Sequence, residues 1–98
     1  MYIQQGDVLI KKVLAVKGKK LNHLTIAVGE VTGHHHTITH GKAELYEDSG
    51  VLYLHVESDT ATLTHQEHNE VVIPKGDYEI GIVKEYDHFL EESKNVAD

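Results

Sequence analysis

Four histidines fall in two pairs whose spacing suits the binding of one metal ion. His34 and His36 form a His-x-His pair within a run of three histidines, and His65 and His68 form a His-x-x-His pair later in the chain. On a strand, residues i and i+2 share one face about 6.5–7 Å apart, so their imidazoles can converge on one ion. His35 must then point to the opposite face. We therefore predict a site built from the two pairs.

Three or four imidazole nitrogens without sulfur suit a transition-metal ion. The chain has no cysteine, which excludes thiolate ligands and disulfides. Nitrogen ligands favour zinc, with iron, nickel or copper as alternatives, whereas magnesium and calcium prefer oxygen. Three ligands would leave an open position for water, and Glu67 or Glu70 could then act as the general base of a metal-dependent hydrolase. Four histidine ligands would close the site.

The histidines also admit a non-enzymatic interpretation. The chain contains nine of them and carries a formal charge of −7 at pH 7. Protonation of all nine would reverse the sign of the net charge in the range where histidine titrates. The alternative function is therefore an interaction or assembly module whose subunit interface responds to pH. In a third interpretation, the histidines are separately exposed or bonded within the core.

The elements that must position these residues are predicted to be strands. Alternating or continuous apolar residues rich in valine, isoleucine and threonine recur in short segments, with no 3.6-residue period. The predicted strands are 7–13, 23–28, 34–40, 43–46, 51–56, 61–65, 70–73 and 78–86. Turns are expected at 47–50 and 74–77, where Gly, Pro, Asp and Ser cluster. This pattern predicts a small antiparallel β-barrel or sandwich.

Length and charge set the domain organisation and exclude some partners. We expect residues 1–87 to form a single all-β domain and 88–98 a polar C-terminal tail, with a short helix as the alternative there. A negative chain without arginine does not suit nucleic acid. No apolar run is long enough for a membrane span, and the start lacks the features of a signal peptide, so we expect a cytoplasmic protein. Small β-domains often cover their edge strands with a partner, which favours a homo-oligomer.

Four short segments stand out: QGDVL at 5–9, GEVTGHHH at 29–36, HQEH at 65–68 and PKGDYE at 74–79. Together they resemble a group of small bacterial and phage proteins that are uncharacterised. The resemblance implies no activity. It marks His34, His36, His65 and His68 as the histidines of the shared motifs.

A weaker similarity is to cupins, small β-barrels that hold a metal ion with His-x-His, a carboxylate and a later histidine. Residues 29–36 are similar to the first cupin motif, and Pro74-Lys75-Gly76 is similar to the Pro-x-Gly turn of the second. His40 stands where the first motif carries glutamate, and Glu79 where the second carries histidine. The similarity therefore implies a cupin-like barrel as an alternative fold, without its ligand set.

Two further segments, His23-Leu24-Thr25 and His35-His36-Thr37, resemble the paired His-x-Thr motifs of the two-histidine phosphoesterases. In that family the two histidines act as acid and base, and the threonines bind phosphate. This resemblance implies phosphate-ester chemistry as another alternative.

Overall fold

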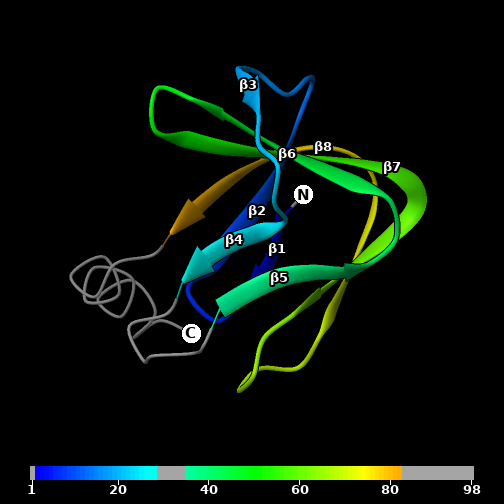
Figure 1. The fold of residues 1–98 in the computed structure, drawn as a ribbon. Helices are drawn as coiled ribbons and strands as arrows, with labels where there is room; N and C mark the ends of the chain where they lie inside the picture. Colours follow the sequence, from blue (N-terminus) through cyan, green and yellow to red (C-terminus); the bar gives the residue numbers. More distant parts are fainter. Residues whose placement is uncertain (1, 29–34, 83–98) are drawn as a thin grey trace, which may run out of the picture.

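The structure is a computed structural model that describes residues 2–28 and 35–82 (Figure 1). Within these residues it contains no helix, and so none that could span a membrane. The strands are β1 (Tyr2–Gln5), β2 (Val8–Val13), β3 (Lys19–Lys20), β4 (Thr25–Val28), β5 (His35–His40), β6 (Ala43–Asp48), β7 (Val51–Thr64) and β8 (Val71–Ile82). The expected all-β fold is confirmed. His34 and the predicted tail at 88–98 lie outside the described residues.

The strands form one antiparallel sheet organised around β7. This strand pairs with β8 on one edge. On its other edge it pairs first with β6, through residues 51–56, and then with β5, through residues 62–64. The order across the sheet is β1-β2-β8-β7-β5-β4, with β3 beside β6. The start of β5 therefore lies next to the end of β7, although the two are far apart in sequence.

A bulge in the middle of β7 bends the sheet. The pairing of β7 with β8 shifts register between Val56 and Thr60. On β8, Pro74 has no N–H to donate, and Gly76 has a φ of 146°, which favours glycine. Residues 74–77, expected to form a turn, are therefore a bend inside β8, and the prediction of separate strands on either side is wrong. The segments 51–56 and 61–65 likewise belong largely to one long strand, β7.

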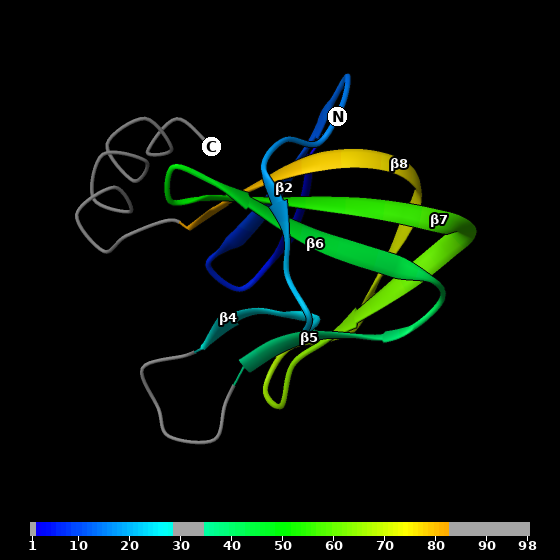
Figure 2. The same ribbon diagram turned by 45° about the horizontal axis from the view of Figure 1, so that its top comes forward.

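The bent sheet curls around a single hydrophobic core. Figures 1 and 2 show β4 and β5 at one end of the curl, across from β1 and β2 at the other. The buried apolar side chains come from six of the strands: Val8, Ile10, Ile26, Ile38, Leu45, Leu54, Val56, Ala61, Leu63, Ile73, Tyr78 and Ile80. Burial of one large aliphatic side chain contributes about 1.5–3 kcal/mol, so this core is the main source of stability.

The β1–β2 hairpin brings polar residues to the open end of the curl. Gln5 pairs with Val8, which leaves Gly6 and Asp7 as a two-residue loop. Gly6 has a φ of 58°, as the first position of a type II′ turn requires. We did not predict β1, although a Gly-Asp pair between two apolar segments is typical of such a hairpin. The loop places Gln5 and Asp7 beside β5, where both contact His36.

Candidate metal centre

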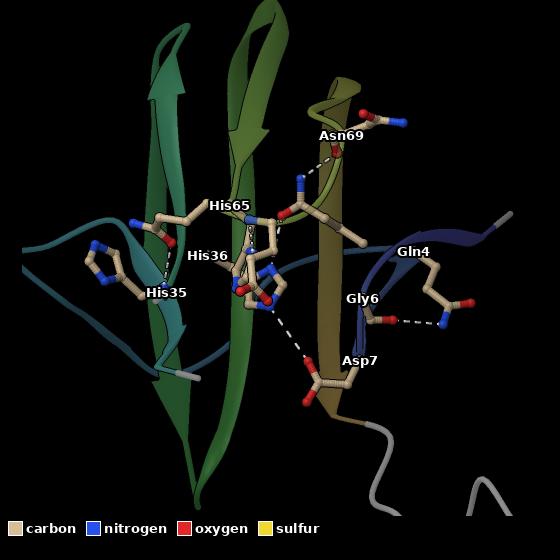
Figure 3. A network of polar contacts seen from close by, with 10 residues as sticks. Gln4, Gly6, Asp7, His35, His36, His65 and Asn69 are labelled. Atoms are coloured by element: carbon tan, nitrogen blue, oxygen red, sulfur yellow. Dashed lines mark hydrogen bonds and ion pairs between the residues drawn. The ribbon is translucent and has the colours of Figure 1, made fainter. Parts of the chain in front are cut away.

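His36 points from β5 into the curled sheet. Alternation along β5 buries His36 and Ile38, at 2% and 4% exposure, while His35 and Thr37 stay partly exposed. Figure 3 shows His35 and His36 directed away from one another. The predicted separation of these two histidines onto opposite faces is confirmed. Among the described residues, the only buried polar side chains are those of His36 and Gln5.

His65 and His68 lie beside His36, although they follow β7. The strands β5 and β7 pair with Thr37 opposite Thr64, so the next residues, His36 and His65, are neighbours. The ring centroids are 4.3 Å apart for His36 and His65, 4.7 Å for His65 and His68, and 6.1 Å for His36 and His68. The structure therefore brings together three of the four histidines that the sequence singled out.

These separations are similar to those of histidines that share an ion. Imidazoles bound to one tetrahedral zinc ion through bonds of about 2.0–2.1 Å have ring centres about 5 Å apart. However, within residues 2–28 and 35–82 no group of three or more His, Asp or Glu side chains could hold a metal ion as it stands. The three imidazole rings are close together, and the hydrogen bonds of each ring decide which of its nitrogen atoms could bind a metal ion.

Gln5 holds the ring of His36 in place. Its Oε1 atom lies 2.8 Å from Nδ1 of His36. Its Nε2 atom donates to the carbonyl oxygens of Leu63 and Asn69, both at 2.9 Å. These bonds tie the end of β1 to the start of β5, to the end of β7 and to the turn that follows it. We call this junction, formed by residues 5–7, His36 and residues 65–69, the seam.

Asp7 faces the other nitrogen of His36. Its Oδ1 atom lies 3.5 Å from Nε2, and the Asp7 side chain is 61% exposed. Burial lowers the pKa of His36 below its ordinary value, and the charge of nearby His65 lowers it further. Asp7 acts in the opposite direction without reversing the shift. His36 is therefore neutral at pH 7. Because Asp7 is exposed, the seam is open to solvent on that side.

The turn after β7 engages one nitrogen of His65. The backbone N–H of Glu67 donates to Nδ1 of His65 at 3.0 Å. In the neutral ring the proton then belongs on Nε2, so His65 would have to exchange this bond before Nε2 could bind a metal. Glu67, the predicted general base, is an exposed residue of the same turn. It lies between His65 and His68 in the sequence.

His68 packs directly on the backbone of Gly6. A Cβ atom on Gly6 would lie 2.6 Å from Nε2 of His68, which is closer than real Cβ contacts allow. The hairpin loop therefore needs glycine for two reasons, its φ and this close approach. As a result, the position of the His68 ring depends on the β1–β2 hairpin.

A pocket of about 360 Å³ adjoins the seam. It is lined by His35, Thr37, Thr39, Thr64, His65 and Gln66. The Gln66 side chain accepts a hydrogen bond from the backbone N–H of His35 at 3.0 Å, which ties the turn to β5. Because His65 borders the pocket and also contacts His36, a molecule in the pocket would lie against the histidine cluster.

Comparison with known proteins gives one family. The family described as Domain of unknown function (DUF8820) matches residues 4–82. The chain belongs to this family. No curated protein and no solved structure matches the chain. The expectation of an uncharacterised family is confirmed, whereas the similarity to cupins and the individual motifs are not confirmed by these comparisons.

The DUF8820 match includes every residue of the seam. The sequence analysis included Gln5 and Asp7 only in the QGDVL segment and assigned neither of them a role at the site. Both residues could have been found from the Gly-Asp hairpin signal, because such a hairpin turns the end of its first strand toward the rest of the sheet.

The two His-x-Thr motifs meet at their threonines, on the neighbouring strands β4 and β5. Strands β4 and β5 are antiparallel, with Thr25 opposite Thr37 and their hydroxyls 3.5 Å apart. This register places Val28 opposite His35, so His23 and His35 lie on opposite sides of the threonine pair. The threonines of the two motifs are therefore neighbours with one histidine on either side of them, and phosphate-ester chemistry stays an untested prediction.

Proposed function

We propose that this protein binds a divalent transition-metal ion at the seam, with Nε2 of His36 as the innermost ligand. The observation that carries the proposal is the approach of Nε2 to Oδ1 of Asp7 at 3.5 Å. With the ring proton on Nδ1, both atoms are acceptors, and they repel one another unless a cation lies between them. A proton is disfavoured there, because burial lowers the pKa of His36. A metal ion satisfies both atoms.

The distance between these two atoms also suits a metal ion. Nitrogen and oxygen ligands of one tetrahedral zinc ion lie about 3.3 Å apart, since each bond is about 2.0–2.1 Å long. His65 and His68 lie on the same side of His36 and supply further imidazoles. His34, two residues before His36, stays a predicted ligand. Imidazole and carboxylate donors favour zinc, with iron, nickel and copper as the alternatives.

Metal binding requires local adjustment at His65 and His68. The bond from the Glu67 amide to Nδ1 has to be exchanged for a metal bond at one of the ring nitrogens. Residues 66–69 are exposed, so the turn can rearrange without disturbing the core. The seam is therefore proposed as a nearly formed site in which His36 is fixed and His65 and His68 adjust.

The bound ion would stabilise the fold. The seam joins the β1–β2 hairpin to β5 and to the turn after β7, segments that only the native state brings together. An ion that binds only the native state adds about 2.7 kcal/mol of stability at a concentration 100 times its dissociation constant. The exposed side at Asp7 leaves room for a water molecule as a further metal ligand. If the protein is an enzyme, this water would attack the substrate in a hydrolysis reaction, with Glu67 as the general base.

Metal analysis of untagged protein, purified without a nickel column, tests the proposal. We expect about one transition-metal ion per chain and a melting temperature that falls when a chelator removes it. The His35→Ala variant, which alters the opposite face, should keep both properties. Protein that contains no metal and takes up none on titration with zinc, iron, nickel or copper would contradict the proposal.

Self-assembly is the second candidate function. Among the described strands, β1 pairs only with β2, β4 only with β5 and β3 only with β6, so these strands leave edges open to another copy of the chain. Such edges are ready sites for strand pairing. Light scattering during size-exclusion chromatography should find a dimer or a larger oligomer, and a monomer at all concentrations would exclude this candidate.

A further inference from the structure

Gln5 is the least expected buried residue of the described chain. Its side chain is 2% exposed, and three neighbours use all of its hydrogen-bonding groups except one lone pair of Oε1. Two of these neighbours are the main-chain carbonyls of Leu63 and Asn69, which can only accept. The third is Nδ1 of His36.

The two carbonyls decide which way the amide of Gln5 points. Its NH₂ group has two hydrogens and donates one to each carbonyl, at 2.9 Å. The reverse orientation would bring Oε1 against two other oxygen atoms with no hydrogen between them, so it is excluded. Oε1 must therefore face His36, where it can only accept.

The orientation of Gln5 in turn decides the tautomer of His36. Because Oε1 accepts, Nδ1 of His36 must carry a hydrogen, at a separation of 2.8 Å. In the neutral ring Nε2 then has a lone pair, and it points toward Asp7. Without Gln5, the opposite tautomer would be preferred, because Nε2–H could donate to the Asp7 carboxylate.

We propose that Gln5 is a positioning residue that keeps His36 in the Nδ1–H tautomer and so presents the Nε2 lone pair to a metal ion at the seam. This inference rests on the proposed function. A metal-bound histidine commonly donates its second N–H to a protein acceptor, which fixes the ring and raises the affinity for the metal. Gln5 supplies that acceptor from β1, while His36 itself lies on β5.

The first experiment measures the tautomer without any metal. Ring ¹⁵N chemical shifts of histidine-labelled, metal-free protein distinguish a nitrogen that carries hydrogen from one with a lone pair. We expect His36 in the Nδ1–H form in the wild type and in Gln5→Glu, since a carboxylate also accepts from Nδ1. In Gln5→Leu we expect the Nε2–H form. An Nε2–H ring in the wild type, or no change in Gln5→Leu, would overturn the inference.

The second experiment measures zinc affinity and thermal stability of the same variants. Loss of an acceptor of this kind commonly weakens metal binding by about 10–100-fold, which we expect for Gln5→Leu. Gln5→Glu should keep an affinity near that of the wild type although it melts earlier, because the Leu63 and Asn69 carbonyls lose donors. Equal loss of affinity in both variants would mean that Gln5 only supports the fold, and would overturn its positioning role.

Gln4→Leu is the matched control, because Gln4 is the neighbouring glutamine and its side chain donates to the carbonyl of Gly6 rather than contacting His36. It should leave the tautomer of His36 and the zinc affinity unchanged. Failure of the wild type to bind zinc or any of the other ions would overturn the proposed function and with it the metal role of Gln5. The ¹⁵N shifts would still decide separately whether Gln5 sets the tautomer.

Discussion

His36 and His55 each lie on a strand next to an aspartate, but the partners are arranged in opposite ways. In His55 the hydrogen-bearing Nδ1 lies 2.6 Å from Oδ1 of Asp77, and both side chains are partly exposed. The other oxygen of Asp77 accepts a bond from the backbone N–H of Val16. At His36, by contrast, Nδ1 is hydrogen-bonded to the side-chain amide of Gln5, and the carboxylate of Asp7 faces Nε2.

This difference separates a structural contact from a candidate binding site. The Asp77 carboxylate has a donor on each oxygen, so the His55 region is satisfied without any ligand and fixes the loop after β2 against the sheet. At the seam, by contrast, the Asp7 carboxylate faces Nε2 of His36, which is a second acceptor in the tautomer that we propose. The same residue types therefore have different roles, depending on which nitrogen of histidine the carboxylate meets.

Replacing His36 or His55 by alanine should give the largest difference between the two regions. His36→Ala removes a buried ring and leaves Oε1 of Gln5 without a donor, so we expect a loss of about 3 kcal/mol in the free energy of unfolding. Zinc binding should disappear. His55→Ala removes a partly exposed bond and should cost about 1 kcal/mol with zinc binding intact. Urea unfolding and zinc titration measure both, and equal effects on zinc binding would contradict the distinction.

Two glycine variants separate backbone strain from damage to the site. Gly6→Ala places a methyl group against His68 at a positive φ, and we expect a loss of about 1–2 kcal/mol together with weaker zinc binding. Gly50→Ala has a positive φ of 83° but nothing within 4 Å of the added Cβ. It should lose stability while zinc binding stays unchanged. Calorimetric zinc titration of both variants is the check, and unchanged zinc affinity in Gly6→Ala would count against His68 as a ligand.

Replacing each aspartate by asparagine should give opposite signs in the metal-free protein. Asp7→Asn introduces an NH₂ group that can donate to Nε2 of His36, so the melting temperature should rise slightly while zinc affinity falls. Asp77→Asn weakens the bond to His55 and should lower stability by about 1 kcal/mol. Thermal melts in the presence of a chelator provide the measurement. A lower melting temperature in Asp7→Asn would show that Nε2 carries the proton.

The smallest expected effect concerns Glu44, which lies opposite His55 on β6. Hydrogen bonds from Lys20 and then from Tyr46 lower the pKa of this carboxyl. Because the folded pKa lies below the unfolded one, its contribution to stability is present above the ordinary pKa of glutamate and is lost as the pH falls through the folded pKa. In Lys20→Met the pKa, measured by NMR titration, should return toward its ordinary value. An unchanged pKa would rule out the Lys20 contact.

The sequence predicted local features of the fold better than distant contacts. Alternation along β5 correctly placed His36 and His35 on opposite faces, because a strand reverses its side chains at every residue. The meeting of His36 with His65 depends on the register of β5 and β7, which the sequence does not encode locally. The bend at Pro74 was mistaken for a turn, because proline and glycine mark bulges and turns alike.

Gln5 was missed for a related reason. Glutamine is mostly an exposed residue, so a buried one in a short strand gives no signal of its own. Only the contacts of its amide with two carbonyls and an imidazole, made by segments far apart in the chain, reveal its role. The candidate ligands were thus predictable by type and spacing, while the residue that orients the innermost one was not.

Zinc titration followed by the ring ¹⁵N signals of histidine tests the central claim most directly. One equivalent of zinc, added to metal-free wild-type protein, should shift Nε2 of His36 and change the signals of His65 and His68, while the signals of His55 stay in place. Unchanged signals at His36, or equal changes at His36 and His55, would contradict a metal site at the seam.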